Sequence, residues 1–255
     1  MQATDLCKEI SAQKLSPEQR LELNLYRGTI AFKIKDYEAA KEALLKSDSA
    51  GYFLLAETYK ALEEYPLAYS YYEKTATYNA LYTAAEMAVS IKDPKTAITY
   101  STLATKEGEK TNHPELWQAY KLSIQGLQES GNPNLELQEQ VFTKAIAHPN
   151  AAVEVYNDFA LFYKDQKDYE KAHQVLDLAI KKFPQEHLSY YNQCACFMDT
   201  EQHNEALEAL EKAYQNGSRK YYEMDDDRPW NILKTYPKGK NLSNCLLYTS
   251  PSPRD

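Results

Sequence analysis

Residues 153–184, VEVYNDFALFYKDQKDYEKAHQVLDLAIKKFP, are the most regular stretch of the chain and indicate its architecture. Counted from Val153, the residues at positions 4, 7, 8 and 11 are Tyr156, Phe159, Ala160 and Tyr163. Spacings of three and four place all four side chains on one face of a helix. The first half of the stretch therefore predicts an amphipathic helix, which the polar residues 164–168 interrupt.

The second half predicts another amphipathic helix, packed against the first. Positions 20, 24 and 27 are Ala172, Leu176 and Ala179, and Pro184 ends the unit at position 32 because it lacks an N–H and has a fixed φ. The small side chains of Ala160 and Ala172 let the two helices approach closely, and the large residues fill the space around that contact. This pattern resembles the tetratricopeptide repeat, which it matches at all eight positions, with Tyr for Trp and Ala for Gly.

Weaker copies of the pattern lie on both sides of this stretch. The alanines at position 20 are Ala40, Ala68, Ala97, Ala172 and Ala206, with steps of 28, 29 and 34 residues where copies are adjacent. A further copy is opened by Trp117, has a longer loop and no such alanine, and is closed by Phe142, Ala145 and Pro149. The short early steps predict tight turns between repeats, or a register that is shifted there by a residue or two.

The resemblance implies an all-α fold, a right-handed superhelical solenoid of about six helix-turn-helix repeats over residues 17–218. Residues 1–16 are expected to form an N-terminal helix, either a cap or part of a repeat that begins before Met1. The segment Ser16-Pro17-Glu18-Gln19 predicts the start of the next helix, with Ser16 as N-cap.

The C-terminal end is expected to cover the last repeat. Residues 219–244 resemble the capping segment of such arrays, and Trp230, Ile232 and Leu233 would pack on the open apolar face. Residues 245–255, CLLYTSPSPRD, resemble a translated sequencing adapter, so we exclude them from the fold prediction. On this interpretation the natural protein continues beyond Asn244.

Composition excludes several classes of protein. Net charge is −8 and no basic stripe is visible, which argues against nucleic acid as a main ligand. No apolar run reaches the roughly 18 residues of a membrane span, and the N-terminus resembles no signal peptide. Four cysteines without framework spacing favour a reducing compartment. We therefore expect an intracellular protein, in the cytoplasm or in an organelle assembly.

We find no residues that predict catalysis, cofactor binding or a metal site. The five histidines lack the H-E-x-x-H spacing, and His113 and His148, each before a proline, are expected to serve turns. Cys194 and Cys196 suggest a soft-metal site only weakly, because Cys194 takes the small, buried position 8. Residues 225–227, three aspartates, lack the spacing and glycine of a calcium loop.

The resemblance also implies a concave groove, lined by positions 2, 5, 9 and 12 of each first helix. The residues that we assign to it are Phe53, Glu57, Lys60, Tyr82, Glu86, Gln118, Leu122, Glu154, Asn157, Leu188, Tyr191 and Asn192. Their aromatic and acidic character predicts a partner protein segment with apolar anchors and some positive charge. The alternative is that these side chains simply face solvent or pack on one another. The Lys/Asn/Arg clamp of co-chaperone repeats is absent.

Three functions fit the sequence. The first is a non-enzymatic scaffold for protein–protein interaction, as a subunit of a larger multiprotein assembly. The second is a transient adaptor that binds peptides in the concave groove. The third is an accessory region of a larger enzyme whose catalytic part lies outside these 255 residues.

Overall fold

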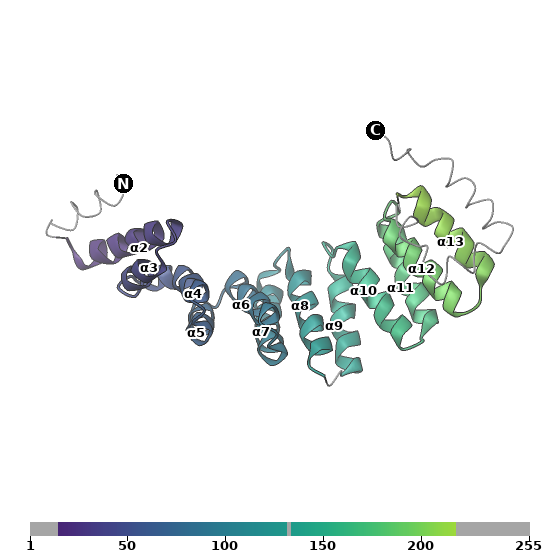
Figure 1. Cartoon of the computed structure of the whole chain (residues 1–255), viewed down its shortest axis with the longest axis horizontal. Helices are drawn as coiled ribbons and strands as arrows, with labels where there is room; N and C mark the ends of the chain where they lie inside the picture. The colour runs from purple at the N-terminus through teal and green to yellow at the C-terminus, as the bar shows by residue number, and fades with distance from the viewer. Residues whose placement is uncertain (1–14, 132–133, 218–255) are drawn as a thin grey trace, which may run out of the picture. The chain divides into compact units, whose positions relative to one another are not determined.

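The computed structural model describes residues 15–131 and 134–217, and this part of the chain is all α-helical, without strands. Its twelve α-helices are α2 (Pro17–Lys33), α3 (Tyr37–Leu44), α4 (Tyr52–Ala61), α5 (Tyr65–Thr75), α6 (Tyr78–Ser90), α7 (Pro94–Thr111), α8 (Leu116–Glu129), α9 (Leu135–Ala147), α10 (Val153–Asp165), α11 (Tyr169–Lys182), α12 (His187–Asp199) and α13 (His203–Gln215). A single turn of 3₁₀-helix, Ser49–Gly51, precedes α4. Consecutive helices pair into hairpins (Figure 1).

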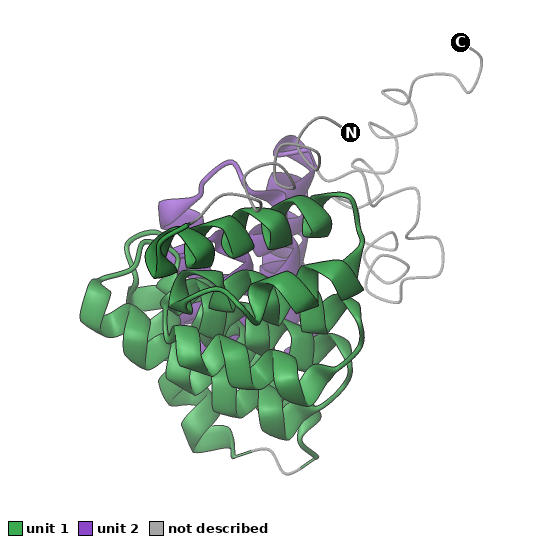
Figure 2. Cartoon of the chain, turned by 90° about the vertical axis from the view of Figure 1, so that its left-hand side faces the viewer, with its two compact units in different colours: residues 1–150 green, residues 151–255 purple. Residues whose placement is uncertain are grey.

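The chain divides into two compact units, residues 1–150 and residues 151–255 (Figure 2). The first unit contains the hairpins α2–α3, α4–α5, α6–α7 and α8–α9, and the second contains α10–α11 and α12–α13. The fold is therefore the all-α helical-repeat solenoid that the sequence predicts. The expected N-terminal helix and the C-terminal capping segment lie outside the described residues.

The stretch 153–184 forms the predicted hairpin. α10 and α11 carry the pattern, and the turn between them falls at residues 166–168. Ala160 and Ala172 are buried where the helices meet, and Leu176 and Ala179 are fully buried. The same small residue is buried at position 20 in four other hairpins, which confirms the register assigned to them.

The start of α2 also follows the sequence. The Ser16 hydroxyl accepts a hydrogen bond from the Gln19 backbone N–H at 3.2 Å, and the Gln19 side chain accepts one from the Ser16 N–H at 2.9 Å. Pro17 occupies the first helical turn, where its missing N–H costs nothing. Two of the backbone donors at the helix start are thus satisfied reciprocally, as the motif predicts.

Each hairpin turns through one residue with positive φ. These residues are Lys35, Glu63, Lys92, Gly131, Lys167 and Glu201, with φ between 58° and 72°. In three of the hairpins the next residue is an aspartate, and its carboxylate caps the second helix. Asp36, Asp93 and Asp168 accept from the N3 backbone N–H at 3.1–3.2 Å.

Shorter helices explain the short steps between the early repeats. α3 has 8 residues and α5 has 11, whereas α11 has 14. The link from α5 to α6 is residues 76–77, and Ala76 has a φ of 53° there. The tight turn expected between these repeats is therefore present, together with a shortened second helix.

The register predicted for the repeat opened by Trp117 is wrong. Assigning Gln118 and Leu122 to positions 5 and 9 places Trp117 at position 4. In α8, however, the residues buried with the spacing of positions 4, 7, 8 and 11 are Tyr120, Ser123, Ile124 and Leu127. Trp117 is only half-buried, one turn earlier. The longer loop hides this shift in the sequence, because the number of residues between the two helices of this hairpin differs from that in the other hairpins.

The missing alanine of this repeat is replaced by a glutamine. Gln138 occupies the place in α9 that alanine takes in the other second helices, and its side chain is only 2% exposed. Its Nε2 has no hydrogen-bond partner in the described part of the chain. A buried donor of this kind loses its hydration without a compensating hydrogen bond, which costs stability.

Candidate protein-binding surface

Five of the residues predicted for the groove lie on α4 and α6 in the first unit. We call them the acidic–aromatic surface: Phe53, Glu57, Lys60, Tyr82 and Glu86. The Phe53 side chain is 38% exposed although it is large and apolar. Glu86 is exposed, and the other three are half-exposed. Aromatic and acidic side chains of α4 and α6 are therefore accessible to solvent.

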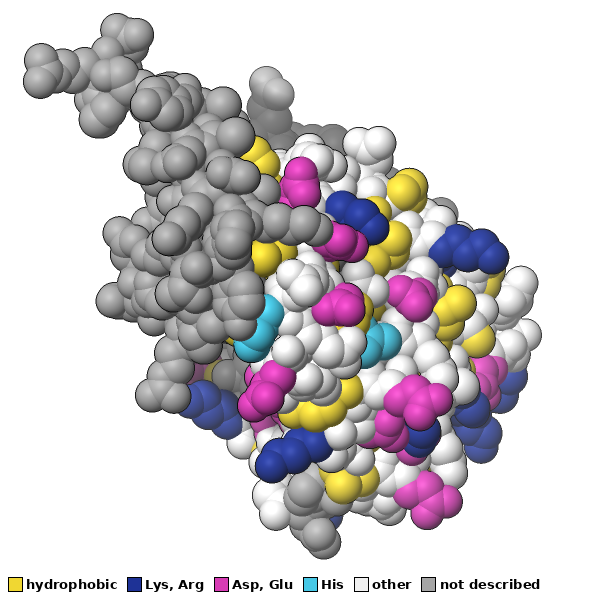
Figure 3. All heavy atoms as spheres, turned by 90° about the vertical axis from the view of Figure 1, so that its right-hand side faces the viewer, with side chains coloured by type: hydrophobic (Ala, Val, Ile, Leu, Met, Phe, Trp, Pro, Cys, Tyr) yellow, Lys and Arg dark blue, Asp and Glu magenta, His cyan; other side chains and the backbone are white. Residues whose placement is uncertain are grey.

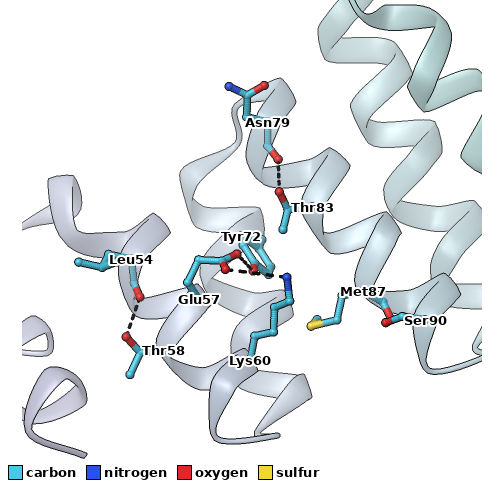
Figure 4. Close-up of polar contacts among 9 residues, drawn as sticks. All are labelled: Leu54, Glu57, Thr58, Lys60, Tyr72, Asn79, Thr83, Met87 and Ser90. Atoms are coloured by element: carbon cyan, nitrogen blue, oxygen red, sulfur yellow. Dashed lines mark hydrogen bonds and ion pairs between the residues drawn. The ribbon is translucent and has the colours of Figure 1, made fainter. Parts of the chain in front are cut away.

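The Glu57 carboxylate is held by the neighbouring helix α5. Tyr72 is fully buried, and its hydroxyl donates a hydrogen bond to Glu57 Oε1 (Figure 4). Burial, and then this hydrogen bond, raises the pKa of Tyr72, so its hydroxyl stays protonated as a donor. The Phe53 ring meets the Tyr72 ring edge-on, with centroids 5.9 Å apart. A buried tyrosine thus fixes the carboxylate at the surface.

The Glu86 carboxylate is oriented in a similar way from its own helix. Tyr82, one turn earlier on α6, donates its hydroxyl to Glu86 Oε1 at 2.9 Å. The Tyr82 ring stacks on Tyr78, which stacks on His113 with centroids 3.7 Å apart. The Tyr78 hydroxyl donates to the backbone carbonyl of Glu115 at 2.6 Å. Stacked rings therefore support the exposed end of Tyr82.

The charges on this surface do not balance. Lys60 Nζ lies 3.8 Å from Glu57 Oε2, at the outer limit of an ion pair. Burial, and then the hydrogen bond and charge of Glu86, raises the pKa of Tyr82, and Glu115 adds to this effect. Glu57 and Glu86 both add to the raised pKa of Tyr72, so the two carboxylates share one electrostatic environment. The acidic groups outnumber Lys60.

The fourth repeat contributes less than the sequence predicts. Gln118 and Leu122 are half-buried on α8. With the corrected register, the exposed Lys121 takes position 5, which the sequence analysis did not find. The signal for this shift was Lys121 itself, because the predicted register places this charged residue at the buried position 8.

In the second unit, two of the predicted groove residues are buried. Asn157 is 2% and Asn192 6% exposed, and Asn192 Nδ2 donates to Asn157 Oδ1 at 3.1 Å. The two amides join α10 to α12, so we correct the expectation that they present a surface to a partner. Glu154 is exposed, and Leu188 and Tyr191 are half-buried.

The second unit presents a mixed surface. Its Lys164 pairs with Asp199 at 3.0 Å, and Leu161, which the sequence analysis did not single out, is exposed on α10. On the end of the molecule in Figure 3, acidic and basic side chains are interspersed with hydrophobic ones, and no broad patch of one sign is visible among the described residues. The first unit therefore holds the better-defined candidate.

Two histidines and two cysteines that the sequence singled out have structural roles. His113 and His148 each accept, at Nδ1, a backbone N–H two residues later at 3.2 Å, which confirms their role in turns. Cys194 and Cys196 are buried, and burial raises the pKa of the Cys196 thiol to about 11. Within residues 15–131 and 134–217, no group of three His, Cys, Asp or Glu side chains is placed to hold a metal ion.

Comparison with known proteins identifies the repeat. The tetratricopeptide repeat family matches residues 153–184. The crystal structure of YrrB, a TPR protein, is 17% identical with a TM-score of 0.51, over 85% of this chain and 97% of YrrB. The Pseudomonas aeruginosa protein pilF is 18% identical with a TM-score of 0.51, over 83% of this chain and 99% of pilF. The C-terminal part of a TPR repeat-containing protein from Cytophaga hutchinsonii is 17% identical with a TM-score of 0.55, over 85% and 98%.

These likenesses show the fold, and the matched repeat lies where the sequence predicts it. Residues 153–184 match the tetratricopeptide repeat, and the described helices share the fold of solved tetratricopeptide-repeat proteins. No curated protein matches its sequence. None of the described helices combines the length and apolarity needed to cross a membrane.

Proposed function

We propose that the chain is a non-enzymatic scaffold that holds a segment of a partner protein on the acidic–aromatic surface, as a subunit of a larger assembly. The observation that carries this proposal is the pairing of the exposed Phe53 ring with carboxylates fixed by tyrosine hydroxyls. Aromatic side chains with solvent contact are the usual anchors of interfaces. A rigid surface also loses little conformational freedom on binding.

The repeat fold supports this use of the surface. α4 and α6 are the first helices of successive hairpins, and Glu57 of α4 and Glu86 of α6 both raise the pKa of the same buried residue, Tyr72. The buried alanines of α6 keep this helix closely packed. YrrB, which shares the fold, is described as having an unusual peptide-binding site. A peptide or an extended loop of a partner would suit a face of this kind.

Substitution of the aromatic residues tests the proposal. The Phe53→Ala and Tyr82→Ala double variant should lose its partner in capture from source-cell lysate, with helicity unchanged by circular dichroism. Leu67→Ala is the matched control, because Leu67 is a similarly exposed apolar residue on α5. Equal capture by the wild type and the double variant would place the partner elsewhere.

A transient adaptor is the second candidate, since the same surface suits brief peptide binding. Native elution of the protein from cell lysate separates the two. Stable co-elution with a particle of hundreds of kilodaltons supports the assembly subunit, whereas elution near the monomer supports the adaptor. A catalytic motif in a longer transcript would favour the third candidate, an accessory region of an enzyme.

A further inference from the structure

The acidic–aromatic surface has a charge pattern that restricts its occupant. Glu86 has no ion-pair partner within the described helices, and neither has Glu115 at the start of α8. Glu57 has only Lys60, at 3.8 Å. A second feature is independent of charge: the Phe53 ring is exposed beside these groups, and the Tyr82 ring is half-exposed.

We infer that the occupant is a partner protein segment that places an arginine or lysine side chain between Glu57 and Glu86, with its stem against Phe53 and Tyr82. This inference rests on the proposed function and names the chemistry of its partner. Each carboxylate accepts one tyrosine hydroxyl, and an ionised carboxylate has about four acceptor sites. Both therefore keep acceptor capacity for a cation.

Arginine fits this site better than lysine. Its planar guanidinium donates to two acceptors at once and stacks on aromatic rings, whereas an ammonium is a compact, strongly hydrated point charge. The tyrosine hydroxyls already hold the carboxylates in place, so little side-chain freedom is lost when the cation binds. The apolar stem of the same residue covers exposed ring surface.

Charge also argues against an acidic occupant. An acidic peptide would approach Glu57, Glu86 and Glu115 with only Lys60 in its favour. Like charges brought together at an interface are costly and exclude wrong partners. Lys60 competes with an incoming cation for Glu57, so its removal strengthens binding of a basic segment.

The test uses four fluorescent dodecamer peptide libraries and the full chain. The libraries share flanks drawn from Ala, Leu, Tyr and Ser, and differ only in the central residue, which is Arg, Lys, citrulline or Glu. Citrulline keeps the shape of arginine without its charge. The expected result is that the Arg library binds about tenfold more tightly than the citrulline library.

Variants assign the effect to the named residues. Glu57→Gln with Glu86→Gln should abolish the preference for Arg over citrulline, whereas Glu73→Gln, an exposed glutamate elsewhere on α5, should preserve it. Lys60→Met should tighten Arg binding about threefold. Circular dichroism checks that each variant keeps its helices.

Two outcomes overturn the inference in distinguishable ways. Equal binding of the Arg and citrulline libraries, still dependent on Phe53 and Tyr82, would leave the proposed function standing and remove the cationic partner. Binding that depends on neither the aromatic residues nor the glutamates would remove both.

Discussion

The turn residue Lys167 offers a sharp test of how these hairpins are built. Its φ of 62° lies in the left-handed region, where an L side chain is crowded by the following carbonyl oxygen. That strain is about 1–2 kcal/mol per residue. Glycine removes this strain, but it loses more conformational entropy on folding, which reduces the stabilisation by about 0.5–1 kcal/mol. Lys167→Gly should therefore stabilise the protein by about 0.5–1 kcal/mol.

Urea unfolding followed by circular dichroism measures the change as a rise in the midpoint. The Lys167 side chain is exposed, and its backbone N–H, which donates to the Lys164 carbonyl at 2.8 Å, is kept in the variant. Two controls should move the other way. Gln174→Gly, an exposed position inside α11, should lose about 1 kcal/mol. Gly131→Ala, at a turn with a φ of 72°, should lose about 1–2 kcal/mol.

A lower midpoint for Lys167→Gly, as for Gln174→Gly, would show that the turn is not strained. Equivalent glycine substitutions at the other four charged turn residues, Lys35, Glu63, Lys92 and Glu201, should each add to the first, because each turn lies in a different hairpin. If the combined variant gains far less stability than the sum of the gains of the single variants, the turns are not independent.

The remaining predictions concern buried side chains. Ala172→Trp should destabilise the second unit by about 1–3 kcal/mol or more, because Ala172 is fully buried at a close helix contact; an unchanged melting temperature, as expected for the exposed Gln174→Trp, would contradict this register. Gln138→Met should stabilise the first unit by about 1 kcal/mol, measured by urea unfolding, because it removes an unpartnered buried donor. Burial lowers the pKa of His173, whose ring packs in a tilted arrangement against Phe197, with ring centroids 4.2 Å apart. The neutral form is therefore favoured on folding, so stability is full above the unfolded value near 6.5 and falls as the pH drops below it; His173→Phe should flatten that dependence in thermal melts at pH 7.5 and 5.5.

The sequence predicts those parts of the fold that depend on residues close together in the chain. The alternation of Ala160 and Ala172 with large residues leaves one way to pack α10 on α11, and the structure has it. The repeat of Trp117 was misplaced because a tryptophan resembles the residue of position 4, and its longer loop gave no fixed spacing to correct the choice. Burial in three dimensions was needed to find Tyr120.

Some features of the candidate surface could be predicted from the sequence and others could not. Phe53, Glu57 and Glu86 were assigned to the groove because the resemblance to the tetratricopeptide repeat places groove residues at their positions in the repeat. The hydrogen bond from Tyr72 could not be predicted, because it joins two helices through a side chain that periodicity assigns simply to the core. Burial of Asn157 and Asn192 was hidden for a similar reason, since each amide depends on a partner 35 residues away.

That amide pair has a consequence for how such a chain changes by duplication or loss of repeats. A repeat with only apolar contacts can be duplicated or deleted, because the apolar surfaces of neighbouring repeats are interchangeable. The hydrogen bond from Asn192 to Asn157 is directional, so each helix carries a polar group that only the other satisfies. Deleting or inserting one hairpin here would leave an amide facing apolar side chains. This hydrogen bond therefore disfavours recombination events that delete or insert a hairpin between α10 and α12.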